Sequence, residues 1–296
     1  MVNNFEDFSV DKSPFSDDWD MSDVDNPFND SEKNVDKSEE ERNYNLRENA
    51  LKDELQLVVS KRANYIFNAG DEFSTMMRCM EHPLSKRIEG NFDDLVTSKK
   101  KNSNDTLESF FTYIDSVYPS PYKNAENLHA DEAEDEYRRT AMSEGQNTGD
   151  NLDEIAKTFS IDGSDRDLHI ATVLKNMGQD SADYQAALSR AIIAYSENPS
   201  QENRSRLTRI QSDHSGALAN SLFNIAETFD SSRTELGKKM FDPTVELATM
   251  LARSSEEYFE GLMGYMKFKM ENSSVKKAEI PSENTSNQIL PDVFLQ

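Results

Sequence analysis

The sequence is poor in several residue types, and each shortage argues against a class of protein. A single cysteine, Cys79, excludes an internal disulfide framework and any cysteine-cluster metal site. The four histidines, His82, His129, His169 and His214, are far apart and form no His-Glu-x-x-His motif. The ten glycines never form a glycine-rich phosphate-binding loop. We therefore expect no enzyme activity, no metal and no cofactor.

Long apolar runs are also missing. Only 35% of the 296 residues are hydrophobic, and the mean hydropathy is −0.80, which is low for one compact core of this length. No run approaches the ~18 apolar residues of a membrane span, and the acidic N-terminal residues contain no apolar signal segment. Acidic residues outnumber basic ones by 56 to 32, a net charge of −24 that opposes binding to nucleic acid. We expect a cytoplasmic protein.

The two ends of the chain are polar and should be disordered. Residues 1–45 contain 14 Asp or Glu and 4 Lys or Arg, too charged to bury enough apolar surface to offset the entropy of ordering. Residues 272–296 are rich in Ser and Asn and are interrupted by two prolines. The ordered domain is therefore expected over residues 46–271.

This central region shows apolar residues at helical spacing. Helical blocks are predicted over about 46–118, 123–196 and 200–270, with interruptions at His82-Pro83 and at 99–104. The last block has the clearest seam and should be one helix of roughly 100 Å with a kink near Pro243. Asn198 is the expected cap at its start.

Three single features of this region allow further predictions. His214 falls on the apolar seam, where a buried neutral imidazole or a polar residue that sets a dimer register are both reasonable. Cys79 lies among methionines and is expected to be a core thiol. The run from Asp162 to Asp167 is similar to a calcium loop but lacks its ligand pattern, so an acidic helix start is preferred.

The three blocks of about 70 residues resemble the three-helix coiled coil of BAR-type dimers, including the sorting-nexin BAR class. The likeness is most specific over residues 196–270, where Ser196-Glu197-Asn198-Pro199-Ser200-Gln201 corresponds to the turn at the arm tip. The aromatic-rich segment 251–266 is similar to the turns that pack at a BAR dimer centre. The resemblance implies an all-α, elongated, antiparallel three-helix coiled coil that forms a homodimer or BAR-type heterodimer. The implied dimer core consists of Leu251, Tyr258, Phe259, Leu262 and Tyr265.

The acidic N-terminal tail contains short aromatic motifs. Asn26-Pro27-Phe28 is similar to the NPF motif that EH domains bind, in which an Asn-Pro turn presents Phe to an apolar pocket. The segments around Phe15 and Trp19 look like acidic aromatic motifs that bind clathrin adaptors. EH-domain or clathrin-adaptor proteins are therefore the expected partners.

A BAR-type protein would also present basic residues to anionic lipid, each worth about 1 kcal/mol. The candidates for this membrane contact are Arg204, Arg206, Arg209, Lys238, Lys239, Lys99, Lys100 and Lys101. The same residues would equally form an ordinary solvated helix face, and the acidity of residues 102–165 argues for this second interpretation.

Together these observations favour a non-enzymatic, dimeric protein of membrane traffic that recruits partners through its tail and binds endosomal or plasma membrane weakly at its periphery. The alternative is an acidic helical scaffold, of the viral assembly or type III secretion kind, that acts only by binding protein.

Overall fold

The computed structural model describes residues 29–79, 81–122, 129–161, 163–230 and 235–273. In this part of the chain it has six α-helices and no strand, which confirms the all-helical prediction. The helices are α1 (Asn29–Cys79), α2 (Ser85–Val117), α3 (Ala130–Ser160), α4 (Asp165–Glu197), α5 (Gln201–Asp230) and α6 (Glu235–Asn272). Side chains are described for these residues except 29–37, 76, 229–230 and 235–244.

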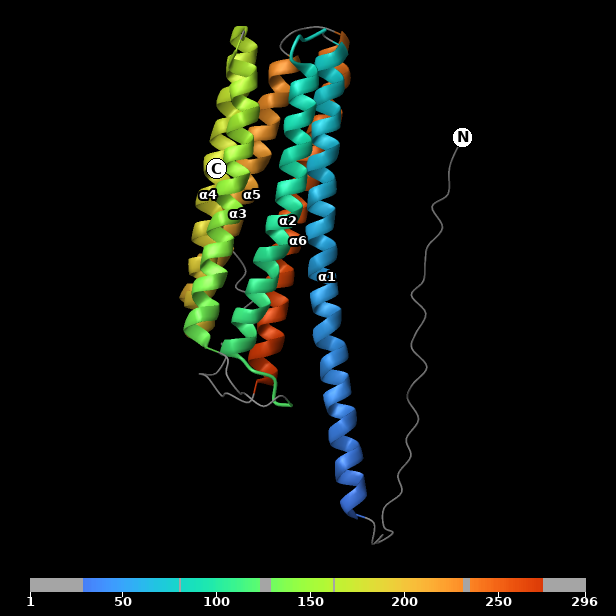
Figure 1. Ribbon diagram of the computed structural model, residues 1–296, viewed down its shortest axis with the longest axis vertical. Helices are drawn as coiled ribbons and strands as arrows, with labels where there is room; N and C mark the ends of the chain where they lie inside the picture. The colour runs from blue at the N-terminus through green and yellow to red at the C-terminus, as the bar shows by residue number, and fades with distance from the viewer. Residues whose placement is uncertain (1–28, 80, 123–128, 162, 231–234, 274–296) are drawn as a thin grey trace, which may run out of the picture. The chain divides into compact units, whose positions relative to one another are not determined.

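The chain divides into two units, residues 1–43 and residues 44–296. In the first unit the described residues form the start of α1, and its side chains from Ser38 to Asn43 are exposed. The second unit is a bundle in which each of α2 to α5 packs against the next helix in sequence. Figure 1 shows these helices running lengthwise beside one another with alternating direction.

The remainder of α1 joins this bundle through contacts with the second and last helices. Lys52 of α1 forms a salt bridge with Asp115 of α2, and Tyr265 of α6 donates a hydrogen bond to Glu48. Leu55 packs so closely on Gly261 that a Cβ atom there would lie 2.6 Å from the leucine Cδ2. The first and last helices of the bundle are therefore neighbours.

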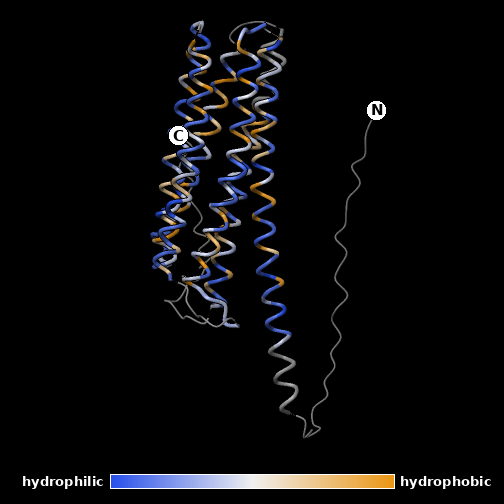
Figure 2. The backbone as a smooth tube through the Cα atoms, in the orientation of Figure 1, coloured by the Kyte–Doolittle hydropathy of each residue, from blue (hydrophilic) through white to orange (hydrophobic). Residues whose placement is uncertain are grey.

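Each predicted block of about 70 residues is two helices in the structure. The single helix over 200–270 is wrong, because α5 ends at Asp230 and α6 begins at Glu235. The two halves pack against each other, with Leu222 of α5 in one apolar cluster with Leu247 and Leu251 of α6. Doubling back buries the hydrophobic seam within one chain, whereas a continuous helix would leave it for another molecule to cover. Hydrophobic positions accordingly recur along every helix in Figure 2.

The ends of the helices follow from local sequence. The break at His82-Pro83 is confirmed, and α1 ends in a Schellman motif in which His82 donates to the Met77 carbonyl and Glu81 adopts a left-handed φ of 55°. The break predicted at 99–104 is wrong, since these residues lie inside α2. The acidic helix start is confirmed, because Ser164 and Asp167 form a capping box at the start of α4.

The turn between α4 and α5 differs in one detail from the prediction. The amide of Asn203 donates to Ser200 Oγ, so Ser200 caps α5 in place of Asn198. The side chain of Asn203 reaches back and donates to the carbonyls of Ala194 and Asn198. These hydrogen bonds join the first turn of α5 to the end of α4 and so fix the geometry of the turn.

Helices α3 and α4 approach each other at backbone contact. A Cβ atom on Gly145 would lie 2.9 Å from the Cα of Ala182, and one on Gly149 would lie 3.1 Å from the carbonyl oxygen of Gly178. Only glycine leaves room for such an approach. These residues are spaced by four along each helix, so they share one face and set the distance between the two helices.

Candidate functional site

The predicted partner motif of the tail lies outside the described residues. Asn26, Pro27, Phe28, Trp19 and Phe15 all precede Asn29, where α1 begins. The described structure therefore does not test the motif.

Most of the predicted lipid-contact cations are on the surface. Arg204, Arg206 and Arg209 are exposed on the first turns of α5, and Arg209 pairs with Asp213 at 3.7 Å. Lys100 and Lys101 are also exposed, whereas the side chains of Lys238 and Lys239 are outside the described set. These placements agree equally with a lipid-binding face and with a solvated one.

The prediction that Lys99 contacts lipid is wrong, because its side chain points into the bundle and is 6% exposed. Its ammonium donates to Glu144 Oε1 at 2.5 Å, and Ser103 donates to the same oxygen at 2.7 Å. Lys99 is thus an internal ion-pair residue and cannot reach a membrane surface.

Burial and pairing shift the pKa values of both Glu144 and Lys99. Burial would raise the pKa of Glu144, but the Lys99 ammonium, the Ser103 hydroxyl and the charge of Arg62 bring it below its usual value. Burial lowers the pKa of Lys99, with Glu144 opposing that effect. The pair is a charged structural link between α2 and α3.

The residues proposed as a dimer core are packed within one chain. Leu251, Tyr258, Leu262 and Tyr265 are at most 7% exposed, and Phe259 is partly buried beside them. Their partners come from other helices of the same chain, such as Leu222 of α5 for Leu251 and Phe111 of α2, whose ring centroid lies 4.8 Å from that of Tyr265. Their burial therefore needs no second chain.

One end of the bundle holds a second ionic cluster. Lys269 lies 2.7 Å from Asp115 Oδ1 and 3.4 Å from Glu48 Oε1, and the hydroxyl of Tyr265 donates to the same carboxylates. Burial acts to lower the pKa of Lys269, but these carboxylates outweigh it and raise the pKa. With Lys52 beside Glu48 and Asp115, two cations balance two anions. This cluster joins α1, α2 and α6, and its charges balance one another without a bound ion.

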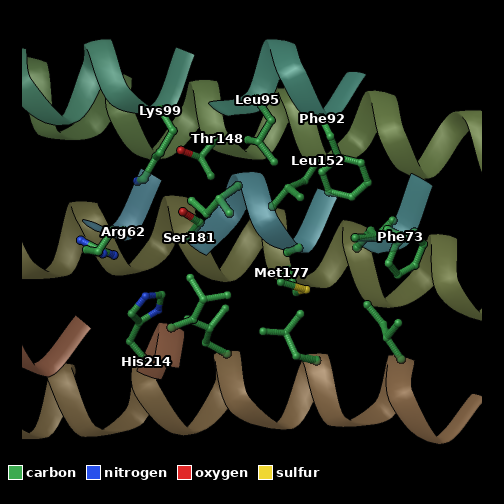
Figure 3. Close-up of a pocket in the computed structure, with 17 residues that line it drawn as sticks. Arg62, Phe73, Phe92, Leu95, Lys99, Thr148, Leu152, Met177, Ser181 and His214 are labelled. Carbon is green, nitrogen blue, oxygen red and sulfur yellow. The ribbon is translucent and has the colours of Figure 1, made fainter. Parts of the chain in front are cut away.

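A partly open cavity of about 120 Å³ lies between the helices of the bundle, and all six helices contribute to its wall. Twelve of its 17 lining residues are apolar: Ile66, Ala69, Phe73, Phe92, Leu95, Leu152, Leu174, Met177, Leu218, Leu222, Ile225 and Leu251. The polar ones are Arg62, Lys99, Thr148, Ser181 and His214. Figure 3 shows Arg62, Lys99 and His214 at one end of the cavity and Phe73 and Phe92 at the other.

The polar end of the cavity is built around Arg62 and His214. The guanidinium carbon of Arg62 lies 5.1 Å from the centroid of the Tyr258 ring, a cation–π contact. His214 stacks on Tyr184 with ring centroids 3.7 Å apart. Burial, together with the charges of Arg62 and Lys99, lowers the pKa of His214 to about 3. His214 is therefore neutral at pH 7, as one of the two sequence interpretations expected.

Two charged residues of this end, Arg62 and Glu144, were not predicted as site residues from the sequence. A signal was present for Arg62, which is a cation on the apolar stripe of Val58, Val59 and Ile66. Glu144 has no comparable signal, because it follows a run of acidic residues and looks like part of a charged surface. Cys79 was wrongly placed in the core, since it is exposed at the end of α1.

Among the described residues, no three His, Cys, Asp or Glu side chains gather as a metal site. The described helices include none that is both long and apolar enough to cross a bilayer. Comparison of the chain with protein-family models, curated proteins and solved structures gives no match. The structure itself describes an all-helical bundle with a cavity that is polar at one end.

Proposed function

We propose that this chain is a non-enzymatic recruiting protein, in which the helical bundle carries an acidic tail that binds partner proteins. The observation that supports the proposal is the exposure of the first described side chains that follow the tail motif in sequence. The first buried side chain among those described is Tyr44. Residues 38–43, which precede it, are all exposed. The motif is thus followed by a helical segment whose described side chains are open to solvent.

The tail motif gives the direct test of this proposal. Phe28→Ala in the full chain should weaken binding to an EH domain about tenfold or more in calorimetry, because the aromatic side chain would fill the partner's apolar pocket. Phe8→Ala, in the same acidic tail but outside the motif, is the matched control and should bind like the wild type. Equal affinity of the two variants would remove the motif from the proposal.

A second candidate is a dimeric, BAR-like protein that contacts curved membrane, and the exposed Arg204, Arg206 and Arg209 are compatible with it. Because each block is doubled back in the structure, such a dimer requires the hairpins to straighten and two chains to exchange halves. It would place the protein on endosomal or plasma membrane. The acidic scaffold alternative requires neither exchange nor lipid.

Light scattering and vesicle co-sedimentation separate these candidates. The BAR-like form should have twice the 33.7 kDa mass of one chain and should pellet with anionic vesicles at low salt, with pelleting lost after changing Arg204, Arg206 and Arg209 to Glu. Changing the exposed Lys86 and Arg87 of α2, which are not among the candidate lipid contacts, to Glu gives a control on another helix. A monomer that stays in the supernatant would leave only the protein-binding function.

A further inference from the structure

The cavity has the dimensions of a small-molecule site. Its volume of about 120 Å³ is close to that of an engineered apolar cavity of about 150 Å³ that holds benzene. Natural cores are packed with few voids larger than a water molecule, so a space of this size in a six-helix bundle is unusual. Phe92, Leu152 and Met177 surround its apolar part.

The polar end of the cavity carries a surplus of positive charge. Lys99 is balanced by Glu144, and His214 is neutral. Arg62 has no anion of its own: within the described residues it makes no hydrogen bond or salt bridge, its guanidinium lies over the Tyr258 ring, and the Glu144 carboxylate that its charge affects is already bonded to Lys99. The polar end of the cavity therefore carries one net positive charge. Because Arg62 is half-buried, its charge is stabilised most by an anion that lies against it and keeps water out.

A second polar group at this end is also unpaired. Nδ1 of His214 is buried and has no hydrogen-bond partner among the described residues. Unsatisfied buried polar atoms are rare in native proteins, because each costs about 1–3 kcal/mol. Arg62 and His214 both line the cavity, so a single bound group could pair with both.

We infer that the cavity is a binding site for a small anionic amphiphile, a carboxylate whose apolar body is about the size of a benzene ring. The carboxylate would pair with Arg62 and lie beside His214, and the body would fill the space between Phe92, Leu152 and Met177. A purely apolar ligand would leave Arg62 unpaired, and an inorganic anion would leave the apolar space empty. This site is separate from the proposed recruiting function, which depends on the tail.

Calorimetry with hexanoate and 1-hexanol tests both halves of the inference on the full chain. Hexanoate should bind with a millimolar or tighter Kd, and 1-hexanol more weakly. Arg62→Met keeps an unbranched, apolar side chain and removes the guanidinium with its charge, so it should weaken hexanoate binding about tenfold or more while changing hexanol binding less than about threefold. Arg62→Lys should retain most of the affinity for hexanoate.

Two further variants control for effects on folding. Ala69→Leu adds bulk to the apolar wall and should abolish binding of both ligands. Arg253→Met removes an arginine of α6 whose side chain is 79% exposed and should leave both affinities unchanged. In the wild type, hexanoate should shift the NMR signals of the His214 ring. Hexanoate affinity that is insensitive to Arg62→Met, or no binding of hexanoate to the folded wild type, would overturn the inference.

Discussion

Lys99→Met should lower the free energy of unfolding by about 3–5 kcal/mol, because it leaves the Glu144 carboxylate buried without its cation. Urea unfolding at pH 8 measures the loss. The double variant Lys99→Met with Glu144→Leu should recover most of it, since an apolar pair of similar volume tolerates the same burial. Lys101→Met, an exposed position on the same helix, is the matched control and should change stability by less than about 0.5 kcal/mol.

The loss of stability in Lys99→Met should depend on pH, and the pKa of Glu144 fixes the direction. In the wild type the pKa of Glu144 is lowered on folding, so its contribution is present above the unfolded pKa and is lost as the pH falls through the folded value. Without Lys99, burial raises the pKa of Glu144, and its protonated form becomes the favoured folded species. The deficit of Lys99→Met should therefore shrink between pH 8 and pH 5. A deficit that is constant with pH would mean that Glu144 is not a buried carboxylate.

Gly145→Leu should destabilise the bundle by about 3 kcal/mol or more, because the added side chain meets the backbone of α4. Gly145→Ala should lie between this variant and the wild type, since its Cβ alone would be 2.9 Å from the Cα of Ala182. Thermal unfolding followed by circular dichroism measures both.

Gly216 provides the control for helix propensity. It lies in α5, and a Cβ atom added there would have no neighbouring atom within 4 Å, so Gly216→Ala should stabilise the protein by up to about 1 kcal/mol. The same substitution is thus expected to have opposite signs at positions 145 and 216. Stabilisation by Gly145→Ala would show that α3 and α4 are not in backbone contact.

The local features of the fold were largely predictable, because they depend on neighbours in sequence. His82-Pro83 breaks a helix and Ser164 starts one, as their chemistry requires. The turn near Pro199 is also where the sequence places it. Helical periodicity correctly identified the buried face of α6, including Leu251 and Tyr258.

What could not be predicted is which surface each buried face meets. The seam through Leu222 and Leu251 has the same pattern whether its partner is a second chain or the next segment of the same chain. Lys99 looks like its neighbours Lys100 and Lys101, and only the position of α3 shows that it is buried. The cavity combines side chains from six helices, so no local pattern indicates Arg62 and His214 together.

The succession of contacts along the bundle also bears on how it folds. Because each of α2 to α5 packs on the next helix, much of the packed surface forms between segments close in sequence, and closing such short loops costs little entropy. The contacts of α1 with α6 are different, since Glu48 and Tyr265 are separated by 217 residues. Helix α1 also packs on α2, its neighbour in sequence, with the ring centroids of Phe73 and Phe92 5.9 Å apart. Hairpin-by-hairpin assembly should therefore precede the closure of α1 against α6, and the Tyr265 cluster would be the last part of the native state to form.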